Sequence, residues 1–235
     1  MSTQSRLNIM HFSDILCVWA YIAQIRIDEL LSEFGDQVEL QYAFIPVFGA
    51  VEQKLETGWH DRGGADGYAS HVQDTVKAFP HVTLHPELWK ADRPTSSLSC
   101  HLFLKSVQLL TKLEELPATI HTPSGDRSPI EAAAWQCRVA FFQDMIDISQ
   151  REQQLDIAAG LGFPTKHIEQ VLNDGSATAA LAQDHLLQTQ LRVAGSPTIV
   201  LNEGRQILYG NVGYRVIQAN VAELLSGARP GASWC

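Results

Sequence analysis

The sequence predicts an α/β domain that is interrupted by a long, all-helical insertion. Three observations support this fold class. A strand, a helix and a second strand are predicted within residues 7–44, no strand is predicted from about residue 48 to residue 191, and a hairpin followed by a helix is predicted within residues 197–225. The two β-containing ends together form one small α/β domain. We therefore predict that residues 1–48 and 192–235 make up this domain and that residues 49–191 form the insertion.

The first predicted unit is a strand, a turn and a helix. An apolar run that includes Phe12 ends at a polar Ser-Asp pair. Apolar residues then recur three and four positions apart from about Cys17 until Gly35, a residue suited to ending a helix. Val38–Phe44 alternates polar and apolar residues and predicts a second strand. We expect a right-handed crossover between the two strands, which makes them parallel.

The insertion carries several helix signals. Ser128-Pro-Ile-Glu131 is a capping box with proline at the first helical position, and it predicts a long helix that continues to about Ile146. Apolar spacing predicts other helices at about residues 66–79, 97–115, 152–159, 165–172 and 176–191.

Strand-forming residues return abruptly near the end of the chain. Pro197–Leu201 is rich in β-branched and apolar residues, and Asn202–Gly204 predicts a turn into a second strand at Gln206–Tyr209. A final amphipathic helix is predicted at about residues 214–225. The remaining residues are predicted to form a flexible tail that contains Cys235.

Composition and charge argue against several classes of function. The chain of 235 residues is 45% hydrophobic and 18% charged, which is typical of a globular protein. Its net charge of −9, with only 17 Lys and Arg residues, argues against an extended nucleic-acid-binding surface. The apolar runs are too short to cross a membrane, and no secretory signal precedes the first strand. With Met1 as the native start, we expect a cytoplasmic protein that binds neither nucleic acid nor membrane.

The four cysteines are widely spaced along the chain, at Cys17, Cys100, Cys137 and Cys235. They include no C-x-x-C pair and no spacing typical of a metal site, so we predict neither a disulfide framework nor a bound metal. Cys17 stands out because it lies on the first turn of the first helix. Unpaired backbone N–H groups and the positive end of the helix dipole favour the thiolate there, and the thiolate is the nucleophilic form.

Two polar side chains precede Cys17 and lie at the end of the first predicted strand. Asp14 is predicted to cap the first helix, with proton transfer near the thiol as the alternative role. His11 is predicted to be a strand histidine with satisfied ring nitrogens, with a role as a base as its alternative.

Two segments resemble the DsbA-like branch of the thioredoxin superfamily. They are Phe12-Ser-Asp-Ile-Leu-Cys-Val-Trp-Ala-Tyr21 and Val193-Ala-Gly-Ser-Pro-Thr-Ile-Val200, and the resemblance covers about residues 7–225. Three pairs in the insertion also fit this pattern, namely Phe141-Phe142, Asp147-Ile148 and Leu161-Gly162. The branch includes dithiol oxidoreductases, glutathione-dependent 2-hydroxychromene-2-carboxylate isomerases and kappa-class glutathione transferases. The resemblance implies a thioredoxin-like fold with a large helical insertion between its βαβ and αββα halves.

The resemblance also implies a site around Cys17. In this branch the proline of the second segment, here Pro197, is cis and faces the active cysteine. Ser196 would then lie beside the sulfur, and its backbone could pair with an extended thiol peptide. The insertion lies over the active helix in this branch. Substrate contacts are therefore expected from Trp19, next to the cysteine, and from three residues of the insertion, Trp59, His60 and Trp89.

A departure from the dithiol members of the branch concerns Ala20. Those members carry a second cysteine at this position, which resolves a mixed disulfide internally, whereas alanine cannot. Three alternatives remain. Glutathione could resolve the mixed disulfide, Cys235 could do so from the tail, or glutathione could be a bound cofactor. In the last case Cys17 stands where the isomerases and transferases usually carry serine.

The resemblance places glutathione binding in part at the segment after the hairpin. Relatives use a small polar residue, an aspartate and an arginine there. Asn211 and Arg215 match two of these, together with Ser196 and Pro197 from the preceding segment, and the aspartate is absent. A helix N-terminus can still hold a carboxylate through its free N–H groups. The alternative interpretation is an ordinary loop before an amphipathic helix.

These features predict a DsbA-like thiol–disulfide oxidoreductase that uses the single active-site cysteine of a C-x-x-A motif and is linked to glutathione. Its substrate would be a small thiol or disulfide. A second hypothesis is a glutathione-dependent isomerase or transferase that acts on a small aromatic or electrophilic molecule. A third is a binding module with a thioredoxin fold that has lost redox activity, for which Ala20 is the supporting feature. The apolar insertion also allows a homodimer.

Overall fold

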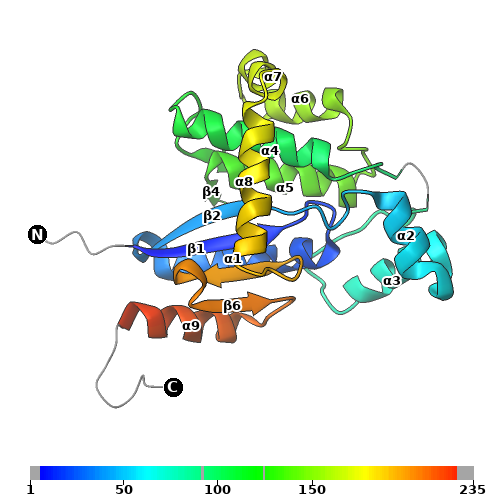
Figure 1. Cartoon of the computed structure of the whole chain (residues 1–235), viewed down its shortest axis with the longest axis horizontal. Helices are drawn as coiled ribbons and strands as arrows, with labels where there is room; N and C mark the ends of the chain where they lie inside the picture. The colour runs from blue at the N-terminus through cyan, green and yellow to red at the C-terminus, as the bar shows by residue number, and fades with distance from the viewer. Residues whose placement is uncertain (1–5, 91–92, 124, 227–235) are drawn as a thin grey trace, which may run out of the picture.

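The structure is a computed structural model that describes residues 6–90, 93–123 and 125–226. Its centre is a four-stranded sheet in the order β2-β1-β5-β6 (Figure 1). The strands are β1 (Leu7–Ser13), β2 (Val38–Phe44), β5 (Thr198–Leu201) and β6 (Gln206–Tyr209). β1 and β2 are parallel, as the sequence predicts, and β5 is antiparallel to both β1 and β6. The end of the chain therefore completes the sheet that its beginning starts.

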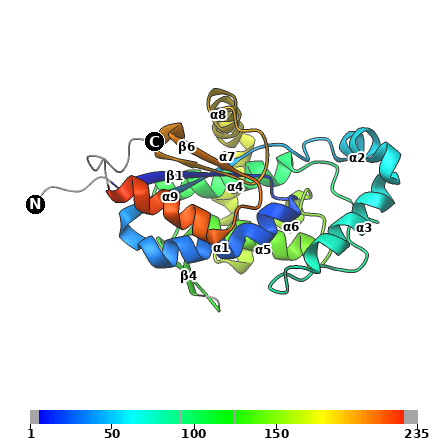
Figure 2. The same cartoon turned by 90° about the horizontal axis from the view of Figure 1, so that it is seen from below.

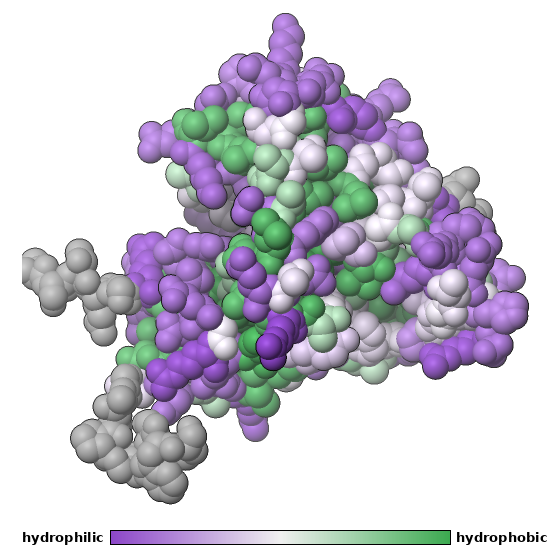
Figure 3. Space-filling model, viewed as in Figure 1, coloured by the Kyte–Doolittle hydropathy of each residue, from purple (hydrophilic) through white to green (hydrophobic). Residues whose placement is uncertain are grey.

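Helices cover both faces of this sheet. α1 (Val18–Phe34) and α9 (Tyr214–Ser226) lie on one face, and α8 (Ser176–Gln190) crosses the other, as Figure 2 shows from below. The fold is thus the thioredoxin-like α/β fold with an insertion that the sequence predicts. On the surface seen in Figure 3, apolar residues gather around α8, whereas α2 and α3 present mostly hydrophilic side chains.

The segment between β2 and β5 is largely helical. Its elements are α2 (Val51–Trp59), α3 (Gly64–Val76), α4 (Leu98–Lys112), β3 (Ile120–Thr122), β4 (Gly125–Arg127), α5 (Pro129–Phe142), α6 (Arg151–Gly160), α7 (Thr165–Asn173) and α8. The prediction of an all-helical insertion missed the hairpin of β3 and β4. Each of these strands has only three residues, and no residue in them is fully buried, so the pattern of alternating apolar residues that identifies a strand is missing.

The helix after the predicted capping box shows how local signals and tertiary structure combine. Ser128 caps α5 as predicted: its backbone N–H donates to Glu131 Oε2 over 3.0 Å, and its hydroxyl accepts from the Glu131 N–H. The helix ends at Phe142, four residues earlier than predicted. Met145 has a left-handed backbone with φ 56°, and the Ile146 N–H bonds to the Ala140 carbonyl, so the chain turns away there.

One hydrophobic core joins the sheet to the insertion. It contains Ile9 and Leu201 from the strands together with Phe103, Leu104 and Phe142 from α4 and α5, all fully buried. The insertion therefore packs directly on the sheet unit, while the division of the chain into domains near residues 48 and 192 stays a prediction. In the described ranges, no helix combines the length and the apolar character that crossing a membrane requires.

Candidate functional site

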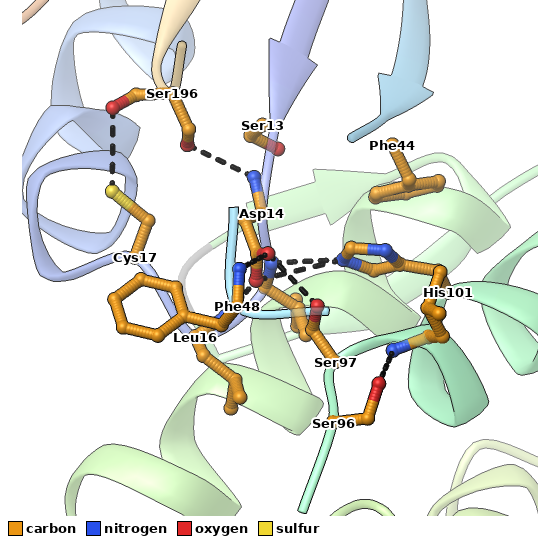
Figure 4. A network of polar contacts seen from close by, with 12 residues as sticks. Ser13, Asp14, Leu16, Cys17, Phe44, Phe48, Ser96, Ser97, His101 and Ser196 are labelled. Carbon is orange, nitrogen blue, oxygen red and sulfur yellow. Dashed lines mark hydrogen bonds and ion pairs between the residues drawn. The ribbon is translucent and has the colours of Figure 1, made fainter. Parts of the chain in front are cut away.

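Cys17 lies where two loops meet at one end of the sheet. It is the N-cap residue of α1, with φ −80° and ψ 115°, and its carbonyl accepts from the N–H groups of Ala20 and Tyr21. The Cys17 thiol donates to the carbonyl oxygen of Ser196, with Sγ 3.4 Å from that oxygen, and the Ser196–Pro197 peptide bond is cis (Figure 4). The sequence separates these residues by 179 positions.

The pairing of β1 with β5 explains this meeting. Phe12 lies opposite Thr198 in an antiparallel register, so the loop that follows β1 and the loop that precedes β5 leave the sheet at the same end. A further hydrogen bond holds the two loops together, because the Asp14 N–H donates to Ser196 Oγ over 2.9 Å. The sheet therefore brings together Cys17, Ser196 and Pro197, three of the residues that the sequence singled out.

The electrostatics of Cys17 differ from the expectation of a favoured thiolate. Only 5% of the residue is exposed, and this burial raises the pKa of Cys17 above its usual value. The contact with Ser196 and the N–H groups of Ala20 and Trp19 act in the opposite direction, while the charge of Asp14 raises the pKa further. The helix start does favour the thiolate, but the removal of water by packing outweighs it, and packing is not visible in a local motif.

Asp14 is fully buried and connects the loop before Cys17 to the insertion. Its Oδ1 accepts from the Leu16 N–H over 2.9 Å, and its Oδ2 accepts from the Phe48 N–H over 2.7 Å and from the Ser97 hydroxyl over 2.8 Å (Figure 4). Burial raises the pKa of Asp14 to about 6 despite these three hydrogen bonds. The predicted capping role is therefore wrong: α1 has no side-chain cap, and Asp14 holds two loops and the start of α4 together.

His101 on α4 lies on the other side of Asp14. Its Nε2 accepts from the Ile15 N–H over 3.2 Å, and 3.7 Å separate this nitrogen from Asp14 Oδ1. Burial lowers the pKa of His101 to about 3, so the ring is neutral at neutral pH and carries its proton on Nδ1. His101 therefore gives Asp14 no positive counter-charge. Ser97 and His101 are not among the site residues predicted from the sequence, although their spacing of four residues puts them on one face of the predicted helix.

Trp89, one of the four predicted substrate contacts, belongs to an aromatic cluster next to the site. Trp89 is only 1% exposed; its ring centroid is 5.3 Å from that of Phe48 and 5.2 Å from that of Tyr68. Burial raises the pKa of Tyr68, and charges on Cys17 and Asp14 raise it further. Trp89 is therefore a core residue beside the site, and its contact with a substrate stays a prediction.

The other three predicted substrate contacts are more accessible than Trp89. Trp59 is partly buried, with its ring 5.1 Å from Tyr68. His60 is exposed and lines a cavity of about 430 Å³ with residues of α2, α3 and Arg93. Trp19 is partly buried and packs edge-on against Phe79 at 6.0 Å. Their contact with a substrate stays a prediction.

The segment predicted to bind glutathione lies near Pro197. Asn211 Oδ1 accepts a hydrogen bond from Arg26 of α1, and Arg215 is exposed near the start of α9. Arg26, Pro197 and His11 line a small internal cavity of about 10 Å³ together with residues of α9 and the loop before it. Two cations are thus available at this end of the sheet, one partly buried and one exposed, for the carboxylates of a peptide-like ligand.

Two of the three other cysteines lie in the described part of the chain, and neither forms a disulfide with Cys17. Cys100 and Cys137 are free, fully buried thiols on α4 and α5, and Cys235 lies outside the described residues. In the described ranges, no three or more His, Cys, Asp or Glu side chains are grouped in a way that could hold a metal ion.

Comparison with solved structures finds a similar fold in proteins named as disulfide isomerase, disulfide reductase and 2-hydroxychromene-2-carboxylate isomerase. A candidate protein disulfide isomerase from Nitrosomonas europaea is 13% identical, with a TM-score of 0.72 over 95% of this chain and 100% of that chain. The cytosolic disulfide reductase DsbM from Pseudomonas aeruginosa is 17% identical, with a TM-score of 0.63 over 93% of this chain and 100% of that chain, and it has also been solved with glutathione. A 2-hydroxychromene-2-carboxylate isomerase is 14% identical, with a TM-score of 0.60 over 92% of this chain and 95% of that chain.

These identities are low and show the shared fold alone. A search of curated proteins finds no match. The DSBA-like thioredoxin domain family, in contrast, matches residues 101–222, which is more than half of the 235 residues. The chain therefore belongs to the DSBA-like thioredoxin domain family.

Proposed function

We propose that Cys17 is the nucleophile of a single-cysteine thiol–disulfide oxidoreductase that uses glutathione as its co-substrate. The observation that carries this proposal is the position of the Cys17 sulfur, 3.4 Å from the Ser196 carbonyl at the cis bond to Pro197. An extended thiol partner that pairs with the backbone of Ser196 would have its own sulfur next to Cys17. Ser196 and Pro197 thus orient the partner.

The proposed reaction exchanges one disulfide bond in each of two steps. The Cys17 thiolate attacks the glutathione sulfur of a small mixed disulfide, forms a disulfide with glutathione and releases the substrate as a thiolate. A second glutathione then attacks the glutathione sulfur bound to Cys17, which forms oxidised glutathione and regenerates the Cys17 thiolate. The proton that the second glutathione loses ends on the released substrate thiol. Over the two steps one reduced glutathione is oxidised and the substrate sulfur is reduced, while the glutathione held in the mixed disulfide leaves as the other half of oxidised glutathione.

Glutathione is the favoured resolving thiol because the described part of the chain offers no suitable neighbouring thiol. Ala20 occupies the position of the second cysteine in a dithiol motif, and Cys100 and Cys137 are enclosed in the packing of α4 and α5. Arg215 and the Asn211–Arg26 pair would contact the glutathione carboxylates. The role of Cys235 as a resolving cysteine remains a second proposal. Because the reaction consumes reduced glutathione, it also implies a cytoplasmic location.

The raised pKa of Cys17 favours a second candidate function, the glutathione-dependent isomerase or transferase. A thiol that stays protonated at neutral pH can donate a hydrogen bond to a bound glutathione thiolate, as a serine hydroxyl would. The aromatic cluster around Trp59 and Tyr68 would then contact an aromatic or electrophilic substrate. In this case glutathione binds without forming a covalent bond to Cys17.

The two functions are separated by mass spectrometry after incubation with oxidised glutathione, together with the pH dependence of Cys17 alkylation. The oxidoreductase requires a glutathione adduct on Cys17 that reduced glutathione removes, and Cys17→Ser must abolish it. Cys100→Ser is the matched control, because it removes a buried thiol outside the site and must leave the adduct intact. Reduced glutathione bound without an adduct would indicate the isomerase or transferase. Absence of both an adduct and bound glutathione would reject both functions and leave a binding role.

A further inference from the structure

Tyr209, the last residue of β6, is an exposed aromatic residue beside the loop that contains the cis peptide bond. It is 59% exposed, and it lies opposite Thr198 in the antiparallel register of β5 and β6. The end of β6 is bonded to that loop, because the Gly210 N–H donates to the Pro197 carbonyl over 2.8 Å. Tyr209 is therefore positioned at the end of the sheet that carries the Cys17 thiol.

The ring of Tyr209 lies against Gly195, the residue before Ser196. A Cβ atom added to Gly195 would be 3.1 Å from Tyr209 Cε2 and 3.2 Å from the Tyr209 hydroxyl oxygen. A larger residue at position 195 would have to displace the ring, so glycine allows the ring to approach the loop this closely. The ring thus contacts the neighbour of the residue whose carbonyl oxygen accepts from the Cys17 thiol over 3.4 Å.

The side chains of β6 alternate between the two faces of the sheet. Leu208 pairs with Ile199, which lines the small internal cavity together with residues of α1 and α9. Because neighbouring side chains of a strand point to opposite faces, Ile207 and Tyr209 point away from α1 and α9. Val200, the partner of Ile207, belongs on that side to the buried cluster against which α8 packs. β6 itself forms an edge of the sheet (Figure 1), and Ile207 is 42% exposed there.

A thiol partner at this end of the sheet therefore meets two different surfaces. The face with α1 and α9 carries Arg26 and Arg215, the two cations proposed to contact the glutathione carboxylates. The side chains that β6 presents on the opposite face, Ile207 and Tyr209, are uncharged and exposed. In a glutathione mixed disulfide, one half carries carboxylates and the chemistry of the other half varies with the substrate. With the glutathione half on the two cations, the substrate half is left with the apolar face.

We propose that Tyr209 determines substrate specificity by stacking on an aromatic group next to the sulfur of the substrate half. This inference rests on the proposed function and names the substrate class of the same site, namely mixed disulfides between glutathione and aromatic thiols. Contact between two aromatic rings contributes to binding beyond the area that it buries. The Cα atoms of Gly195 and Ser196 are about 3.8 Å apart, a distance that a ring joined to the disulfide through one carbon atom can span.

The test compares two substrates, the glutathione mixed disulfides of benzyl mercaptan and of 2-mercaptoethanol. Each turnover converts one mixed disulfide and one reduced glutathione into oxidised glutathione and the free thiol. The measured quantity is kcat/KM for the mixed disulfide, expressed as the ratio of the benzyl value to the 2-mercaptoethanol value. Tyr209→Ala should lower this ratio by roughly three- to tenfold. Tyr209→Phe retains the ring and should keep the ratio within about twofold of the wild type.

Tyr209→Leu retains an apolar side chain without the ring, so it should lower the ratio as well. Leu113→Ala is the control: it removes an apolar side chain that is 64% exposed at the end of α4, in the insertion, and should leave the ratio unchanged.

The wild-type ratio in natively folded Tyr209→Ala would overturn the proposal. If Tyr209→Ala does not fold, the wild-type ratio in Tyr209→Leu has the same consequence. A ratio in Tyr209→Phe as low as in Tyr209→Ala would also overturn it, because the hydroxyl and not the ring would then select the substrate. Failure of the proposed function appears differently, as the absence of a glutathione adduct on Cys17 in the wild-type chain.

Discussion

The carboxylate of Asp14 accepts a hydrogen bond from the hydroxyl of Ser97 over 2.8 Å, and this contact joins the loop before Cys17 to the start of α4. It is one of three hydrogen bonds that the fully buried Asp14 carboxylate accepts. Asp14 lies 83 residues before Ser97 and three residues before Cys17 in the sequence. The insertion therefore contributes to the site by holding a negative charge next to Cys17, as well as by covering it.

Asp14→Asn should lower the pKa of Cys17, because the negative charge of Asp14 disfavours the thiolate. We expect the alkylation midpoint to fall by about half a unit. Ser97→Ala is the control: it removes one hydrogen bond to Asp14 and keeps the carboxylate, so the midpoint should not fall. A midpoint in Asp14→Asn equal to that of the wild type would show that the carboxylate is too well screened to affect the thiol.

The stability of the protein should fall between pH 7 and pH 5. Burial lowers the pKa values of His11 and His101 to about 3, so on acidification below pH 6.5 these side chains take up protons in the unfolded chain but not in the folded protein. Each histidine therefore lowers the free energy of unfolding by about 1.4 kcal/mol per pH unit below 6.5. Asp14 acts in the opposite direction, because its raised pKa of about 6 stabilises the fold as the pH falls toward 4. Two histidines outweigh one carboxyl, and the net loss is about 2–3 kcal/mol. Urea unfolding at pH 7 and at pH 5 measures this loss. Equal free energies of unfolding at the two pH values would contradict the lowered pKa values of the two histidines.

His11→Phe should stabilise the protein at pH 7 by about 1 kcal/mol. His11 is fully buried, and neither ring nitrogen has a hydrogen-bond partner among the described residues, while its ring already packs edge-on against Tyr42 at 5.6 Å. Phenylalanine keeps that packing and removes the unpaired nitrogens. The loss of stability between pH 7 and pH 5 should also shrink to less than about 1 kcal/mol, since one of two buried histidines is gone. A destabilised variant would indicate that His11 has a polar partner in solution.

Ala20→Cys should convert the single-cysteine site into a dithiol site. The introduced thiol lies one turn after Cys17, and its attack on a glutathione adduct would release glutathione and form an internal disulfide. Mass spectrometry should then find a loss of two hydrogens in place of the adduct. Ala23→Cys, also on the buried side of α1 but a turn further on, is the matched control and should keep the adduct. A stable adduct in Ala20→Cys would show that position 20 cannot reach the Cys17 sulfur.

Local patterns determined much of this protein. The apolar spacing and Gly35 determined α1, the capping box determined the start of α5, and the two segments around Cys17 and Pro197 predicted the family and the residues that meet at the sheet edge. These features depend on neighbours in the sequence, or on a motif that a family shares. For that reason they are readable without coordinates.

Only the tertiary structure decided the chemistry of the site. The helix start at Cys17 favours a thiolate, yet packing by the insertion removes water and raises the thiol pKa. Asp14 is a residue type that often caps helices, but here it bonds to Phe48 and Ser97. The ring nitrogens of His11, predicted to be satisfied, have no hydrogen-bond partner within the described ranges. Desolvation and buried charge depend on which segments pack together over more than 80 residues of sequence. A linear pattern shows which groups are present, whereas the fold decides which of them lose water and which charges they face.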